Sequence, residues 1–235
     1  MMHQIDVCLT PELLHLYDLK GKIVVIVDIL RATTSMTSAL ANGVADITPV
    51  ATVEACRDLQ SQGYIAAAER DGKQVAGFEL GNSPLAYLDG AFAGKRLAMS
   101  TTNGTLAIEK SKAEAAEVII GSFLNLLAVC DYIQTQQKDV LVLCAGWKGK
   151  FNMEDTLFAG AVVESLVATH TYSCDAPLAA QRLYQVAKED LIGFMSVASH
   201  TKRLQNHGIE KDIAFCFQLN EYTIVPKLRG SVLTK

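Results

Sequence analysis

The stretch KIVVIVDILRATTSMTSALANG (residues 22–43) joins an apolar strand directly to a helix, and it decides the fold class that we expect. Residues 22–29 are almost continuously apolar and rich in β-branched side chains, which is typical of a strand covered on both faces in a parallel sheet. The helical pattern that follows ends at Asn42-Gly43, a pair that commonly terminates a helix. Strand and helix are joined by an acid, a base and hydroxyl side chains, namely Asp28, Arg31, Thr33, Thr34 and Ser35.

The rest of the chain repeats this alternation of short apolar strands and longer helical patterns. Such alternation predicts a three-layer α/β/α sandwich with a mixed, mostly parallel sheet, whose last two strands pair antiparallel at an edge. No linker or low-complexity segment divides the chain, so we expect a single domain over residues 1–235. The further strands are predicted over residues 46–51, 64–69, 96–101, 117–122, 139–146, 212–219 and 223–228, and further helices over 52–63, 152–170 and 175–187.

Two segments of the chain share an outline of strand, Thr-Thr, helix, strand, hydroxyl and helix. They cover residues 26–56 and 96–130, with Thr33-Thr34 matched to Thr101-Thr102. Because right-handed βαβ units repeat this outline in unrelated folds, an internal duplication is one interpretation of the likeness and fold geometry is the other.

Composition and charge exclude several classes of protein. Half of the 235 residues are hydrophobic and 20% are charged, as in an ordinary globular protein, and the formal net charge is −4. A mildly acidic chain is poorly suited to bulk binding of nucleic acid or an anionic membrane, so we expect neither partner. No signal peptide pattern or transmembrane run is present, and the six cysteines form no CxxC pair, which together favour a cytoplasmic protein with reduced thiols.

Polar side chains follow the predicted strands at their carboxyl ends, where ligands collect in open α/β sheets. The carboxylates there are hard oxygen ligands of the kind that Mg²⁺ prefers, whereas arginines, hydroxyls and helix starts suit phosphate and other oxyanions. The two kinds of group side by side indicate metal-assisted phosphoryl chemistry. The acids are Asp28, Glu69, Glu154 and Asp155, and the candidate anion donors are Arg31, Thr33, Thr34, Arg70, Asn82, Thr101, Thr102 and Asn103.

Each of these residues also has a structural interpretation. A threonine such as Thr33 or Thr102 can simply cap a helix, and Glu154 can complement the dipole of a helix that starts at Asn152. Arg31 and Arg70 can form structural ion pairs. Familiar catalytic motifs are missing. A cysteine phosphatase loop requires an arginine six positions after its cysteine, and in CAGWKGK (residues 144–150) that position is Lys150. Among the histidines, only His200 lies in a suggestive polar turn.

Seven motifs occur in an order that resembles the 2-phosphosulfolactate phosphatase family. They are VDILRATTS, AERDG, GFELGNSPLAY, STTNGT, GSFLN, CAGWKGKFNMEDTLFAG and SHTKRL, and the resemblance runs from about residue 22 to about residue 228. It implies a Mg²⁺-dependent phosphatase with its own type of α/β/α sandwich. The implied reaction converts (2R)-2-phospho-3-sulfolactate to (2R)-3-sulfolactate and phosphate, a step toward coenzyme M. The chain departs from the expected pattern at Asp71 and Trp147, and in the lysines that follow Trp147, which bears on substrate identity more than on fold.

The resemblance and the residues together give a hypothesis for the site. Mg²⁺ would be held by Asp28, Glu69 and Asp155, and Asp28, Arg31 and Glu154 would be the catalytic residues. The phosphate or sulfonate would be bound by Arg31, Thr33, Thr34, Thr101, Thr102 and Asn103, with Arg70 and Asn82 as second choices.

Two other functions stay open from the sequence. The chain could be a phosphatase for another small phosphorylated hydroxy acid, or a non-catalytic binder of small oxyanions. A mere binder has no need of acids beside its anion donors, since carboxylates repel such a ligand unless a metal intervenes. A homodimer is the default expectation for the assembly.

Overall fold

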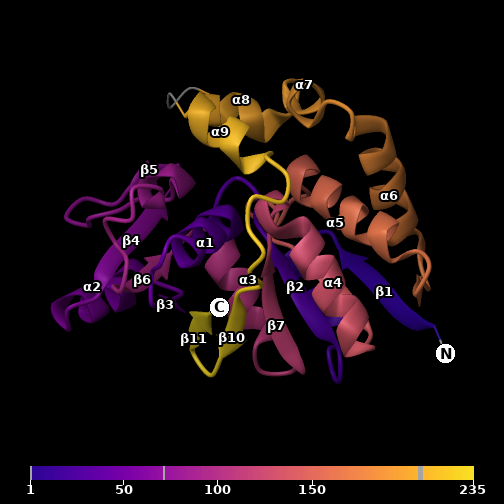
Figure 1. Ribbon diagram of the computed structural model, residues 1–235, viewed down its shortest axis with the longest axis horizontal. Helices are drawn as coiled ribbons and strands as arrows, with labels where there is room; N and C mark the ends of the chain where they lie inside the picture. Colours follow the sequence, from indigo (N-terminus) through magenta and orange to yellow (C-terminus); the bar gives the residue numbers. More distant parts are fainter. Residues whose placement is uncertain (1, 71, 206–208) are drawn as a thin grey trace.

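A computed structural model describes residues 2–70, 72–205 and 209–235, and it shows one eleven-stranded sheet with helices around it (Figure 1). Asp71, one of the departures from the family pattern, lies outside the described residues. The strands are β1 (His3–Cys8), β2 (Ile23–Val27), β3 (Asp46–Pro49), β4 (Ile65–Arg70), β5 (Lys73–Gln74), β6 (Arg96–Ser100), β7 (Glu117–Gly121), β8 (Val140–Cys144), β9 (His170–Thr171), β10 (Lys227–Arg229) and β11 (Val232–Thr234).

The helices fall between the strands and after them. The α-helices are α1 (Ala32–Ala41), α2 (Val53–Ser61), α3 (Gly104–Ser111), α4 (Leu126–Gln136), α5 (Met153–Leu166), α6 (Asp175–Ala187), α7 (Leu191–Met195), α8 (Ser199–Gln205) and α9 (Glu210–Cys216). Short 3-10 helices are η1 (Pro11–Leu16), η2 (Pro84–Tyr87) and η3 (Phe123–Asn125). No helix in the described ranges is both long and apolar enough to cross a bilayer.

The sheet consists of two parallel halves joined by a hairpin. Its order is β5-β4-β6-β3-β11-β10-β7-β2-β8-β1-β9, and the pairs within β4-β6-β3 and within β7-β2-β8-β1-β9 are parallel. The antiparallel hairpin β10–β11 bridges the halves, with Lys227 opposite Ile119 of β7 and Leu233 opposite Ile47 of β3. The predicted mixed, mostly parallel sheet is confirmed.

Two apolar clusters lie on opposite faces of the sheet because successive strand residues point to opposite sides. On one face, Val25 of β2 belongs to a cluster with Leu157 of α5 and other residues of α4 and α6. On the other face, Val24 belongs to a cluster with Met36 of α1 and residues of α3 and η1. Helices therefore cover both faces, which confirms the α/β/α sandwich.

The C-terminal part of the prediction is wrong in two places. Residues 212–219, predicted as a strand, contain the helix α9, because Ile213, Cys216 and Phe217 are buried at helical i, i+3, i+4 spacing. The last predicted strand, residues 223–228, corresponds to the shorter β10, and the hairpin that β10 forms with β11 lies in the middle of the sheet rather than at an edge. The apolar run misled because its composition suits a strand as well as a buried helix.

The two segments with a shared outline form two similar units whose strands interleave. β2 of the first segment lies between β7 of the second and β8, which follows the second segment in the chain. In the same way, β6 of the second segment lies between β3 of the first and β4, which follows the first segment. The detailed match differs from the predicted one. The Asp28 backbone N–H donates to Thr33 Oγ1, and the Thr101 N–H donates to Thr105 Oγ1, so Thr33 corresponds to Thr105 and Asp28 to Thr101.

Candidate active site

The two halves of the sheet run antiparallel to each other through the β10–β11 hairpin. The turns that follow β2, β4, β6 and β8 nevertheless meet, beneath a helical cap formed by α7, α8 and α9 (Figure 1). A cavity of about 420 Å³ lies between the strand ends and the cap. Such a crevice at the carboxyl edge is where α/β sheets bind ligands. It is lined by Leu30, Arg31, Glu69, Gly72, Asn82, Trp147, Lys148, His200, Arg203 and Leu204.

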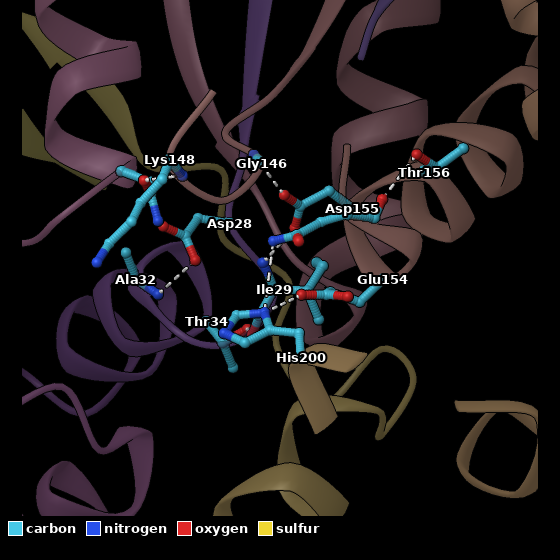
Figure 2. Close-up of polar contacts among 12 residues, drawn as sticks. Asp28, Ile29, Ala32, Thr34, Gly146, Lys148, Glu154, Asp155, Thr156 and His200 are labelled. Carbon is cyan, nitrogen blue, oxygen red and sulfur yellow. Dashed lines mark hydrogen bonds and ion pairs between the residues drawn. The ribbon is translucent and has the colours of Figure 1, made fainter. Parts of the chain in front are cut away.

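Asp28 sits in the turn between β2 and α1 and is almost completely buried. Its Oδ1 accepts a hydrogen bond from the Ala32 N–H at 3.3 Å, as Figure 2 shows, while a Cβ built on Gly104 at the start of α3 would lie 2.9 Å from Oδ2. The carboxylate therefore faces the N-termini of two helices. Its pKa is raised to about 6, with burial as the largest cause; the charges of Glu69 and Glu154 contribute to the rise, and His200 and the hydrogen bond from Ala32 oppose it.

Glu69 is the next-to-last residue of β4 and lines the cavity, and one of its carboxylate oxygens is held by hydrogen bonds. Its Oε1 accepts from the Gly72 N–H at 2.9 Å and from the Thr102 hydroxyl at 3.2 Å. The neighbouring Arg70 turns the other way, because its guanidinium donates to the Ser100 hydroxyl and to two backbone carbonyls, including that of Ser100. The structure thus brings Glu69 to the cavity, whereas Arg70 fastens β4 to β6.

Asp155 joins the loops that follow the neighbouring strands β2 and β8. Its Oδ1 accepts from the Ile29 N–H at 2.9 Å and its Oδ2 from the Gly146 N–H at 3.0 Å, both visible in Figure 2. Desolvation in its buried position raises its pKa well above the usual range, and the neighbouring acids raise it further. Both oxygens are therefore already engaged by backbone donors, which makes Asp155 a structural link between the loops after β2 and β8.

Glu154 lies beside Asp155 in the first turn of α5 and pairs with His200 of the cap. Its Oε1 contacts His200 Nδ1, and its Oε2 is buried without a hydrogen-bond partner among the described residues. The indole ring of Trp147 lies against the imidazole with centroids 5.3 Å apart. Asn152 Nδ2 lies 3.4 Å from the same Nδ1.

Arg31 is held by a second link to the cap. Its Nη1 pairs with Asp212 Oδ2 of α9, and both side chains are more than nine-tenths buried. The Ser83 hydroxyl donates to the other Asp212 oxygen at 2.8 Å. Next to Ser83, Asn82 lines the cavity, and its buried Oδ1 lacks a hydrogen-bond partner in the described part of the chain. Arg31 and Asn82 are thus both placed at the cavity wall.

The predicted threonine donors are engaged within the turns. Thr33 Oγ1 accepts from Asp28 N–H, and the Thr34 hydroxyl donates to the Ile29 carbonyl at 2.8 Å. Thr101 Oγ1 accepts from the Thr105 N–H, and Asn103 Oδ1 accepts from the Lys148 N–H at 3.3 Å. None of these side chains lines the cavity. They hold the turns before α1 and α3 in shape. The capping prediction for Thr33 and Thr102 is wrong, because Arg31 and Asn103 occupy the N-cap positions and neither makes a side-chain capping bond.

One wall of the cavity is aromatic and cationic. Two cations lie over the ring of Trp147: the ammonium of Lys148 is 5.2 Å and the guanidinium of Arg203 is 5.0 Å from the ring centroid. Both cations also line the cavity. Together with Arg31 they make this wall a recognition surface for anionic groups.

Glu69 and several cations line one cavity, and Asp28 lies buried beside it, which is an arrangement suited to a metal ion and a phosphorylated ligand. Within the described ranges, no three or more His, Cys, Asp or Glu side chains form a ready-made metal cluster. Mg²⁺ rarely needs one, because it usually keeps several waters and binds one or two carboxylates together with substrate phosphate. Asp28 and the free oxygen of Glu69 fit that pattern, and they act on each other electrostatically.

The sequence missed several residues of the site, all of them in or near the cap and the loop after β8. From the sequence, His200 is predicted only to lie in a polar turn, and Asp212 is predicted to lie in a strand. Trp147 was treated only as a departure from the family pattern. Cys144, which begins CAGWKGK, is fully buried in β8, and desolvation raises the pKa of its thiol well above the usual range, as suits a core cysteine and not a nucleophile. The signal that could have found His200 is the motif SHTKRL itself.

Comparison with known proteins is consistent across nearly the whole chain. The family model described as 2-phosphosulpholactate phosphatase matches residues 8–231. The chain is 40% identical over 221 residues to a probable 2-phosphosulfolactate phosphatase of Caldanaerobacter subterraneus subsp. tengcongensis, covering 92% of this chain and 91% of that protein. It is 35% identical over 236 residues to the protein of the same name from Clostridium acetobutylicum, covering 98% and 100%. These matches confirm the resemblance read from the motifs: the chain belongs to the 2-phosphosulfolactate phosphatase family, whose members are phosphoric monoester hydrolases.

Proposed function

We propose that this protein hydrolyses (2R)-2-phospho-3-sulfolactate to (2R)-3-sulfolactate and phosphate with the help of Mg²⁺. The observation that carries the proposal is the cavity beneath the cap, which Glu69 lines together with Arg31 and a wall of further cations. Asp28 lies buried beside it, close enough for the charge of Glu69 to raise its pKa. The substrate carries a phosphate, a sulfonate and a carboxylate on three carbons. A site for it needs several cationic donors and a means of neutralising the phosphoryl group.

Asp28 and Glu69 are the residues that would hold Mg²⁺. Each has an oxygen without a hydrogen bond to the rest of the described chain, and Glu69 lines the cavity. The ion would supply charge neutralisation at the phosphoryl oxygens and a lowered pKa for bound water. Asp155 as a third ligand stays a prediction, since its two oxygens accept backbone hydrogen bonds.

The remaining residues bind and orient the substrate. Arg31 is pre-positioned by Asp212, so its guanidinium is ordered before ligand arrives. Asn82 offers an unsatisfied buried amide oxygen, which suits a hydroxyl or water near the phosphate. Lys148 and Arg203 on Trp147 would bind the second and third anionic groups, which distinguish phosphosulfolactate from simpler phosphorylated acids.

Release of phosphate by the purified protein tests the proposal. The protein is incubated with phosphosulfolactate, phospholactate and phosphoglycolate, each with Mg²⁺ and with EDTA. We expect Mg²⁺-dependent turnover that prefers phosphosulfolactate, and its loss in Asp28→Asn. A preference for phospholactate or phosphoglycolate would identify a phosphatase for another hydroxy acid. Saturable binding of these acids without any phosphate release would identify an oxyanion binder.

Arg203→Gln provides the matched specificity test. Its side chain belongs to the cationic wall and makes no contact with the acids of the turn after β2 among the described residues. We expect kcat/KM to fall for phosphosulfolactate and to change little for phospholactate, which lacks the sulfonate. An equal loss for both substrates would remove Arg203 from recognition of the sulfonate.

Three wider expectations accompany this function. The enzyme would act in the cytoplasm, in a step toward coenzyme M or in another use of sulfolactate. It would act on a small molecule without nucleic acid or membrane as partner. Its assembly as a homodimer is a prediction that the sedimentation of the purified protein tests.

A further inference from the structure

His200 is held at the cavity in an orientation that a proton donor requires. It is the histidine that lines the cavity in the described part of the chain, and it comes from the cap rather than from the sheet. Its ring is 5% exposed, so its position is set by protein contacts and not by solvent. Trp147 covers one face of the ring, with the centroids 5.3 Å apart.

Glu154 fixes which nitrogen of the ring faces the cavity. The carboxylate pairs with Nδ1 and is itself 1% exposed, anchored in the first turn of α5 (Figure 2). A carboxylate on Nδ1 holds the proton there and orients the ring, as in other histidine sites in which a second group sets the tautomer. No hydrogen bond to Nε2 occurs among the described residues, so this nitrogen is available to a ligand in the cavity.

The leaving group of the proposed reaction needs such a donor. The ester oxygen departs as the alkoxide of a hydroxy acid, which is a strong base and leaves slowly unless it is protonated. Arg31 and the other cations of the cavity can neutralise phosphoryl oxygens, but an arginine does not release a proton at ordinary pH. An imidazole within reach of the ester oxygen is the usual solution.

We propose that His200 is the general acid that protonates the leaving oxygen and that Glu154 is its positioning residue; this rests on the phosphatase function proposed above. As the bond between phosphorus and the ester oxygen breaks, its electron pair stays on that oxygen, which takes the proton from Nε2 of the imidazolium. Water forms the new bond to phosphorus, and both of its protons leave with the phosphate as dihydrogen phosphate. One of them then returns to the imidazole, so the products are the hydroxy acid and hydrogen phosphate.

The test uses His200→Asn, whose amide keeps a polar group near the Nδ1 position and removes Nε2. His200→Gln is the second variant in case the first does not fold, and the exposed His15→Gln is the matched control. Phosphate release from phosphosulfolactate gives kcat, calorimetric titration with sulfolactate gives product affinity, and substrate labelled with ¹⁸O at the ester oxygen gives the isotope effect on its departure. Arg31→Lys serves as a slowed enzyme whose proton donor is intact.

We expect kcat to fall by roughly 100- to 10,000-fold in His200→Asn with sulfolactate affinity nearly unchanged, and to stay at the wild-type value in His15→Gln. The ester-oxygen isotope effect should be larger in His200→Asn than in Arg31→Lys. In His200→Asn no new O–H bond forms in the transition state to compensate for the weakened bond between phosphorus and the ester oxygen. Glu154→Gln should give a smaller loss of kcat, since the ring remains but is no longer held by a charge.

Two results would overturn the inference while leaving the phosphatase function intact. One is turnover by His200→Asn and His200→Gln close to that of the wild type. The other is a loss that appears as weaker sulfolactate binding with the same isotope effect as Arg31→Lys, which would make His200 a binding residue. Failure of the proposed function itself looks different, because the wild-type protein would then release no phosphate from phosphosulfolactate with Mg²⁺.

Discussion

Asp28→Asn should stabilise the metal-free protein at neutral pH while it removes Mg²⁺-dependent turnover. Asp28 carries its charge in a buried turn, where desolvation raises its pKa from 3.8 to about 6, with Glu69 and Glu154 adding to the rise. An acid whose folded-state pKa is raised binds its proton more tightly in the folded than in the unfolded state. Its contribution to stability is therefore fully present below pH 3.8 and is lost as the pH rises through 6.

The size of the effect follows from that shift. Ionised Asp28 costs about 3 kcal/mol of unfolding free energy at pH 7 and about 1 kcal/mol at pH 4.5. The asparagine avoids this cost, and its amide oxygen can still accept from the Ala32 N–H. For a chain of this length, about 3 kcal/mol corresponds to a rise in Tm of roughly 6–12 °C.

Thermal unfolding at pH 7 and pH 4.5, in EDTA and in excess Mg²⁺, measures this. In EDTA the gain of Asp28→Asn should shrink between pH 7 and pH 4.5. Added Mg²⁺ should raise the Tm of the wild type by mass action and leave the variant nearly unchanged, since the variant lacks the ligand. Asp58→Asn on the exposed face of α2 is the control and should show neither effect. A variant that is no more stable than the wild type in EDTA at pH 7 would refute the reasoning.

Four further substitutions probe the supports of the site. Asp212→Asn should lower the unfolding free energy by about 3–5 kcal/mol in urea titrations and weaken substrate binding, because it leaves the buried Arg31 charge without its partner. Gly104→Ala should cost about 1–3 kcal/mol and reduce kcat, since the added methyl would lie 2.6 Å from Ala32 Cβ and push the two helix starts apart. Thr33→Val and Thr105→Val should each cost about 1–3 kcal/mol by orphaning a buried N–H, and only Thr33→Val should also slow turnover, because its partner is the Asp28 N–H. Equal kinetic effects of the two threonine variants would argue against a special role for the turn after β2.

The central part of the site could be predicted because its residues follow apolar strands. The runs that form β2, β4 and β8 are continuous enough to locate each strand end, and parallel pairing brings the ends of β2 and β8 together. The end of β4 comes from the other, antiparallel half of the sheet, an arrangement that the sequence does not predict. Asp28, Glu69 and Glu154 do act on one another, as the pKa of Asp28 reflects. What the sequence could not give is the direction of each side chain. Arg70 and Thr34 lie near the site, as predicted, but their side chains donate hydrogen bonds to carbonyl groups of the neighbouring backbone.

The cap could not be predicted for a different reason. Its contribution to the site depends on how α8 and α9 fold back over the strand ends, and nothing in the local pattern of residues 191–216 encodes that return. His200 is 46 residues from Glu154 and Asp212 is 181 residues from Arg31 along the chain, so neither pair has a spacing rule that would reveal it. The apolar run around Ile213 further suggested a strand, although tertiary burial at helical spacing makes it α9.

The site owes its chemistry to the features that break the internal repeat. Two equivalent helix starts meet where Gly104 approaches Ala32, and two equal helix N-termini alone would make a symmetric anion-binding crevice. One unit places Asp28 at its turn whereas the other places Thr101 at the equivalent position, so the two turns differ in charge. The cap then adds Asp212 to hold Arg31 and His200 to face the cavity, neither of which has a counterpart in the repeated units. A crevice that binds oxyanions thereby gains a place for a cation and a source of protons, which are the two additions that turn phosphate binding into phosphate transfer to water.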